Sequence, residues 1–401
     1  MLRRLAPASA KAARTWRACL ALGWWALTLL AMPGLAAEPT PCEFSATSGQ
    51  SLPLEGVAEV FLDGGEAVDV SAIDAGRVPF APQHGQSFGG LLTRGTLWIR
   101  TQIRPCPEGG GTYLYLNNGS LESVTLHVPI RGAGRTARRL LYGGWGHGAG
   151  DQERFVSPVF RLPIDYDDSR PLLIAVRSPY LLQFGVTLLN QSAWQRESMG
   201  ILLLLGLGLG VLLALLLYNL ALFAGIGDRH YFNYLLYALS LLSYLGIDPY
   251  VSLFGFIAPG ISVALMPYFP IFPLLLLVAM NVFSRAFLDS RHTAPRHDRV
   301  LKALLMVPAV VMLVLLLGYR WEAARFTYLL LHGMVFLQIT AGISALRAGY
   351  RPARFFLLAV AAPLLGVLVF SGQIHNLLPR NEVTVRAFFL GFVAEALLLS
   401  L

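Results

Sequence analysis

Charged residues are scarce in this 401-residue sequence, and lysine almost absent. Only 13% of the residues are charged and 55% are hydrophobic, which excludes an ordinary water-soluble domain and indicates a polytopic membrane protein. Lysine occurs at positions 11 and 302 alone. A retinal protein needs a lysine inside a late membrane span, and Lys302 lies at the edge of a predicted loop. That class is therefore excluded.

Cysteine is equally rare, with three residues in the whole chain. Cys19 lies in a predicted leader, which leaves Cys42 and Cys106 in a segment predicted to be exported. Export usually means an oxidising compartment, so a disulfide between these two is one interpretation. Two unpaired buried thiols are the other, and the sequence leaves both open.

Residues 1–37 have the features of a secretory signal peptide. A basic start is followed by the apolar run CLALGWWALTLLAMPG and by Ala36 and Ala37. An uncleaved anchor helix is the alternative. The five cations of this segment account for most of the formal net charge of +8, and the remaining +3 does not indicate nucleic-acid binding. No nucleic-acid partner is expected.

Residues 38–196 are predicted to form an all-β domain. Segments such as GTLWIRTQIRP (95–105), TYLYLNN (112–118) and SVTLHVPI (123–130) alternate apolar and polar residues and are separated by turn signals. This period-two pattern, repeated every 8–12 residues, favours an antiparallel sandwich or jelly roll. Trp98, Tyr115 and Trp145 are the candidate ligand-binding residues, because flat aromatic faces stack on sugar rings. Packing in the core is the alternative for each of them.

Residues 197–401 are predicted to form an all-α bundle of seven transmembrane helices. Predicted inner loops carry nine Lys and Arg residues and outer loops four, which places the exported domain outside and the chain end inside. The seventh stretch is short and is expected to be an incomplete helix. The predicted spans are residues 199–223, 231–247, 261–283, 303–319, 326–346, 355–378 and 387–401.

Polar residues inside these spans are functional candidates by default. The candidates are Asn219, His332, Gln338, Gln373 and Glu395. Hydrogen bonding between helices is the alternative role for them. Gly206, Gly208 and Gly210 predict close packing of the first span, and three prolines between residues 267 and 273 predict a bent third span.

Catalytic patterns are weak in the membrane half. The string Gly225-Ile226-Gly227-Asp228 matches the GxGD of intramembrane aspartyl proteases, but no span supplies a second aspartate. A rhomboid-type serine site fails because Val369 stands where a glycine precedes the serine. No enzyme activity, metal or cofactor is expected. A transporter or channel component is an alternative, although it predicts clustered polar residues and an internal repeat that are not seen.

Several of these segments, in this order, resemble the bacterial seven-transmembrane receptors with diverse intracellular signalling modules. The segments are GTLWIRTQI, YLYLNNGSLESVTLHV, RFVSPVFRLPI and PLLIAVRSPY in the exported part, and LYNLALF, DRHYFNYLLYALSLLSYLG and EALLLSL in the membrane part. The resemblance implies a type 2 extracellular domain, a jelly roll similar to carbohydrate-binding modules.

The resemblance also implies a function. It predicts a receptor of the bacterial inner membrane that senses a periplasmic small molecule, with a carbohydrate as one class, and acts as a homodimer or with a signalling partner. Its seventh helix would lead to a cytoplasmic histidine kinase or diguanylate cyclase. The sequence ends before any such motif, so the output activity is expected to lie outside it.

Overall fold

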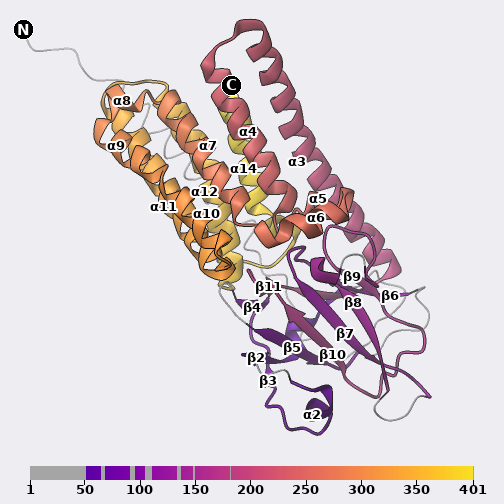
Figure 1. The fold of residues 1–401 in the computed structure, drawn as a ribbon. Helices are drawn as coiled ribbons and strands as arrows, with labels where there is room; N and C mark the ends of the chain where they lie inside the picture. Colours follow the sequence, from indigo (N-terminus) through magenta and orange to yellow (C-terminus); the bar gives the residue numbers. More distant parts are fainter. Residues whose placement is uncertain are drawn as a thin grey trace, which may run out of the picture.

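The computed structural model describes residues 51–64, 68–90, 95–103, 111–132, 137–147, 150–180 and 182–400. Strands occupy the first part, up to residue 190, and helices the rest (Figure 1). The predicted fold class, an all-β domain followed by a helical bundle, is confirmed. The predicted signal peptide and both Cys42 and Cys106 lie outside the described residues.

Two antiparallel sheets form the β domain. Within each strand, successive side chains point to opposite faces of the sheet. The first sheet has the order β1 (Ser51–Pro53), β12 (Val186–Asn190), β6 (Thr112–Leu116), β9 (Val159–Arg161). The second has the order β3 (Ala81–Pro82), β2 (Glu59–Asp63), β5 (Thr96–Thr101), β10 (Leu172–Arg177), β7 (Ser123–Pro129), β8 (Arg138–Gly143). A further pair joins β11 (Leu182–Phe184) to β4 (Phe88–Gly90).

The inner faces of the two sheets pack together as a sandwich. Ile174 of β10 lies opposite Ile99 on one side and Leu126 on the other. These three side chains are fully buried with Leu114 and Leu188 of the facing sheet in one apolar cluster. Each such burial stabilises the fold by about 1.5–3 kcal/mol. The short helices η1 (Leu54–Gly56), α2 (Val70–Asp74) and η2 (Trp145–His147) lie between strands. The jelly-roll connectivity stays a prediction.

The helical part follows the sandwich without a linker. Asn190, the last residue of β12, caps α3 (Gln191–Ile226) by accepting a hydrogen bond from the Ala193 amide at 2.8 Å. Asp228 of the GxGD string likewise caps α4 (Arg229–Ile247), which gives that aspartate a structural role. The other helices are α5 (Leu253–Ile257), α6 (Pro259–Leu265), η3 (Met266–Tyr268), α7 (Ile271–Phe287), α8 (Ser290–Thr293), α9 (Pro295–Leu304), α10 (Val307–Leu316), α11 (Arg320–Arg347), α12 (Ala353–Ile374), α13 (Glu382–Val385) and α14 (Ala387–Ser400).

Within the described residues, four helices are long and apolar enough to cross a membrane: α3, the α9–α10 rod, α11 and α12. A fifth span forms if α6–η3 and α7 count together, and these meet at 75°. The prolines between residues 267 and 273 explain this break, so the predicted bend is confirmed. The apolar helices α4 and α14 fall short of the same criterion but lie in the same bundle (Figure 1). Each predicted span overlaps one or more of these helices, although the span 355–378 runs past the end of α12 at Ile374 and the span 303–319 includes the turns on both sides of α10.

Helix α14 packs closely against α12 and α3. Side chains at Gly366 of α12 and Gly391 of α14 would collide with the backbone of the other helix, and one at Gly208 of α3 would collide with the Phe389 ring. Close packing of the first span is therefore confirmed at Gly208, whereas Gly206 and Gly210 face open space. The last residues of α14 lie at the end of the bundle far from the sandwich (Figure 1).

Candidate functional site

The sandwich rests on one end of the helix bundle, and this junction gathers the polar contacts between the two parts (Figure 1). One part of it is the segment that follows α4. The Gly119 amide donates to the Pro249 carbonyl at 2.6 Å, and the Tyr180 hydroxyl donates to the Pro267 carbonyl at 2.5 Å. Arg154 Nε donates to the Phe256 carbonyl at 3.0 Å. In the segment after α4, backbone carbonyls that lie in or next to short helices and prolines thus accept hydrogen bonds from the sandwich.

A second part of the junction is a buried ion pair between Glu55 of η1 and Arg380, which lies between α12 and α13. The side chain of Glu55 is 4% exposed and that of Arg380 13%. Burial raises the pKa of the Glu55 carboxyl, although Arg380 and hydrogen bonds act in the opposite direction. The Val186 amide also donates to Glu55, at 3.0 Å. The pair therefore connects the first residues of the β domain, at Glu55, and its last strand, at Val186, to the helix bundle.

The position of Arg380 is fixed by its surroundings. Its amide donates to Gln86 Oε1 at 2.6 Å, and its Nη1 donates to the Gln86 carbonyl at 3.1 Å. Gly185 lies directly beside the guanidinium, so that a methyl group at position 185 would overlap with it. A glycine at this position is what leaves room for the ion pair.

Gln373, a predicted intramembrane candidate, lies near the same contact. Its Nε2 donates to Ser87 Oγ at 3.2 Å, and nearby Asn376 accepts from the Gln86 amide at 2.8 Å. Gln373 thus lies at the end of α12 that contacts the sandwich.

A third group of buried charges surrounds Arg386, which immediately precedes α14. Arg386 is 1% exposed, pairs with Glu382 one turn earlier, and has Tyr115 Oη at 3.5 Å from its Nη2. Asp248, just after α4, is also buried. Burial raises the pKa of Asp248 to about 6, against the opposing effects of the Tyr250 amide and the Arg386 charge. The segment that leads into α14 therefore contacts the sandwich at both Arg380 and Arg386.

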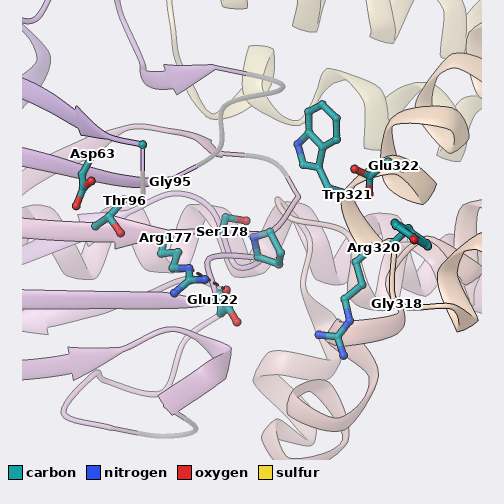
Figure 2. A pocket seen from close by; sticks show the side chains of 13 residues that line it. Asp63, Gly95, Thr96, Glu122, Arg177, Ser178, Gly318, Arg320, Trp321 and Glu322 are labelled. Atoms are coloured by element: carbon teal, nitrogen blue, oxygen red, sulfur yellow. Dashed lines mark ion pairs between the residues drawn. The ribbon is translucent and has the colours of Figure 1, made fainter. Parts of the chain in front are cut away.

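A cavity of about 550 Å³ lies between the sandwich and the start of α11 (Figure 2). Such a volume suits a small metabolite. Arg177 and Glu122 form one wall, with 3.8 Å between Nε and Oε2. Arg320, Trp321 and Glu322 of α11 form the other. Both halves of the chain line this cavity.

The three aromatic residues predicted as ligand contacts lie in different places. Trp98 is 6% exposed and packs with Ile73 and Leu173 on the outer face of the larger sheet. Tyr115 packs against Phe155 and Trp194 at the junction, and both residues are buried with it.

Trp145 lines a small cavity of about 40 Å³ together with Ser252 and Ser262 of the segment around α5 and α6. Its Nε1 donates to the Ser120 carbonyl at 3.1 Å. Neither Trp98, Tyr115 nor Trp145 lines the larger cavity, and nothing in the pattern around them pointed to Arg177 or Arg320.

The intramembrane candidates make contacts between helices. Asn219 Nδ2 donates to Ser400 Oγ at 3.1 Å, which joins α3 to α14. The Tyr237 hydroxyl of α4 donates to Glu395 of α14 at 2.7 Å, with both side chains buried. These contacts match the hydrogen-bonding alternative for both residues.

The two remaining candidates lie on α11. Gln338 is buried, whereas His332 is placed on the helix without a described side chain. No group of three or more His, Cys, Asp or Glu side chains in the described ranges could hold a metal ion.

Comparison with known proteins agrees with this architecture. The sequence profile described as "7TM diverse intracellular signalling" matches residues 201–401, and the one described as "7TMR-DISM extracellular 2" matches residues 55–190. A search of curated proteins gives no significant match. The first profile covers the helical half and the second the β domain. The chain belongs to the family of seven-transmembrane receptors with diverse intracellular signalling modules.

Proposed function

We propose that this multi-pass membrane protein is a receptor of the bacterial inner membrane. Its sandwich lies in the periplasm and responds to a small molecule. The helix bundle transmits the change through α14 to a cytoplasmic output module of the histidine kinase or diguanylate cyclase type. The chain acts as a homodimer or with a signalling partner, and its own role is sensory.

The observation that carries this proposal is the Glu55–Arg380 ion pair. Arg380 lies in the segment that enters α14, and Glu55 lies in the sandwich. Any shift of the sandwich that moves Glu55 must move Arg380 or break a buried ion pair. Breaking such a pair costs about 3–5 kcal/mol. Typical coupling between receptor sites is about 1–3 kcal/mol, so the contact is strong enough to transmit it.

The close packing of α14 provides the next step. Glycine contacts leave no space between α14 and α12, so a displacement at the start of α14 has to be accommodated along the helix. Near its far end, α14 is bonded to α4 through Glu395 and to α3 through Ser400. A ligand shifts this system only if it binds two arrangements with different affinity.

The test uses the full chain in lipid nanodiscs and the Gly185→Ala variant, in which the new methyl group displaces the Arg380 guanidinium. Nitroxide labels are introduced at Leu220 of α3 and Leu397 of α14, both exposed, through a genetically encoded ketone amino acid. Electron spin resonance then measures the distance between them. Gly56→Ala is the matched control, because position 56 adjoins Glu55 and faces open space.

We expect Gly185→Ala to change the distance distribution and Gly56→Ala to leave it as in the parent. Identical distributions in all three proteins would contradict transmission through Arg380. A substrate flux in proteoliposomes that Gly185→Ala leaves unchanged would favour the transporter class instead.

A further inference from the structure

Both walls of the cavity between the sandwich and α11 carry cationic and anionic side chains. On the sandwich side, Arg177 and Glu122 adjoin each other, and the Glu122 amide donates to the Arg177 carbonyl at 2.9 Å. On the α11 side, Arg320 and Glu322 stand two residues apart. The sandwich wall therefore carries Arg177 with two anions, Asp63 and Glu122, and the α11 wall carries Arg320 and Glu322, whose side chains extend in different directions (Figure 2).

The sandwich pair is available for other contacts. The 3.8 Å between Arg177 Nε and Glu122 Oε2 exceeds hydrogen-bond distance, and the Arg177 side chain is 66% exposed. A guanidinium offers several donors in one plane, a geometry that matches a carboxylate with two parallel hydrogen bonds. A glutamate offers only acceptors, which an ammonium group can satisfy. The pair thus provides complementary sites for two opposite charges.

The presence of both acidic and basic side chains in the lining narrows the ligand class. A dianion in this cavity would face Asp63, Glu122 and Glu322, and a dication would face Arg177 and Arg320. A molecule with one carboxylate and one ammonium group matches both sets. The exposed Tyr319 ring adds an aromatic face that attracts an ammonium group, as does the Trp321 ring, which also has the Arg325 guanidinium 5.4 Å from its centroid.

We propose that the cavity between the sandwich and α11 binds a small zwitterion, a free amino acid or short peptide, with its carboxylate at the arginines and its ammonium group at the glutamates. Bound there, the ligand joins the sandwich to α11 and so adds a second contact between the two parts, in addition to the Glu55–Arg380 pair. The inference rests on the proposed receptor function and names the ligand class and its site.

The test measures binding directly, by calorimetry and thermal shift on the full chain in nanodiscs. The probes are the individual standard L-amino acids and alanyl-alanine, with glucose, galactose, succinate and putrescine beside them. Each probe that binds is tested again as its N-acetyl derivative, which lacks the cation, and as its C-terminal amide, which lacks the carboxylate. We expect both derivatives to bind at least about tenfold more weakly.

The variants are Arg177→Gln and Glu322→Gln, each expected to weaken binding about tenfold or more. Arg131→Gln is the matched control, because Arg131 is another exposed sandwich arginine paired with a carboxylate, that of Asp168, away from the cavity. It should bind as the parent does, which also reports that the fold survives the loss of a surface arginine.

Three results would overturn the inference: no amino acid or dipeptide binds, the blocked derivatives bind equally well, or Arg177→Gln and Glu322→Gln bind as the parent does. Binding of glucose or galactose that depends on Arg177 would also overturn it and favour a carbohydrate. If binding fails while Gly185→Ala still changes the α14 distance, the zwitterion site is wrong and the receptor function stands. If a zwitterion binds while Gly185→Ala leaves the α14 distance unchanged, the site is right and transmission through Arg380 is wrong.

Discussion

Removing Arg380 alone should destabilise the junction more than removing both partners of its ion pair. In Arg380→Met, the Glu55 carboxylate stays buried, 4% exposed, without its counter-charge. Loss of one partner from a buried pair costs about 3–5 kcal/mol. Glu55→Leu similarly leaves the Arg380 guanidinium uncompensated. In the double variant neither charge is left, and apolar side chains fill a site that is already shielded from water.

The magnitude follows from comparing the single and double variants. If each single substitution costs about 3 kcal/mol and the double variant less than either, the interaction energy is above about 3 kcal/mol. Glu55→Leu also removes the acceptor of the Val186 amide, which adds about 1 kcal/mol to both variants that carry it. That contribution cancels in the cycle, because it is common to both.

The assay is thermal and denaturant unfolding of the full chain in nanodiscs, followed by tryptophan fluorescence. The pH dependence provides an independent check. Burial already raises the pKa of Glu55, and loss of Arg380 should raise it further. As pH falls through that raised pKa, the carboxyl becomes neutral and no longer needs a counter-charge. The defect of Arg380→Met should therefore shrink at acid pH.

Two results would refute this reasoning. One is additivity of the single substitutions to within about 0.5 kcal/mol, which would mean that the two charges do not interact. The other is a defect in Arg380→Met that stays constant from neutral to acid pH.

Three further outcomes are expected from variants of the junction and bundle, each measured by thermal unfolding in nanodiscs. Asp248→Asn should stabilise the protein by up to about 3 kcal/mol at pH 8 and little at pH 4. The reason is the raised pKa of the parent carboxyl, because of which the stability of the parent falls as pH rises from about 4 through about 6. An equal effect of the substitution at both pH values would contradict this. Tyr237→Phe should cost about 1–3 kcal/mol by leaving Glu395 without its donor, and an unchanged melting temperature would show that the bond contributes nothing. Gly366→Ala should cost about 1–3 kcal/mol by separating α12 from α14, whereas Gly206→Ala, which faces open space, should cost nothing; equal effects would exclude the steric explanation.

The sequence predicted the elements well because local pattern determines them. Alternation in segments such as 95–101 and 123–129 identified the strands, and hydropathy identified the helical stretches. The proline cluster identified the break before α7. These features depend only on residues a few positions apart, so they can be recognised in a single sequence.

The junction depends on residues far apart in the chain, and local pattern gives no sign of it. Glu55 and Arg380 are separated by 325 positions. In the sequence, Arg380 is one of the four Lys and Arg residues of the predicted outer loops, and Glu55 lies between two apolar stretches. The cavity is similarly composed of a β-strand end and a helix start. Tertiary arrangement alone brings such groups together.

For the proposed receptor function, the contacts of α14 offer a path by which a small movement at the junction would reach the far end of the bundle. Its first residue follows Arg386, which is buried under the sandwich, while its last turns are bonded to α4 and α3. Between these ends the glycine contacts with α12 exclude gradual sliding, because closely packed helices move between discrete arrangements. The Tyr237–Glu395 bond, buried among apolar side chains, must stay formed in each arrangement or cost about 1–3 kcal/mol. Under the proposed receptor function we expect helix α14 to respond as one body with two or a few stable positions, among which the junction contacts select.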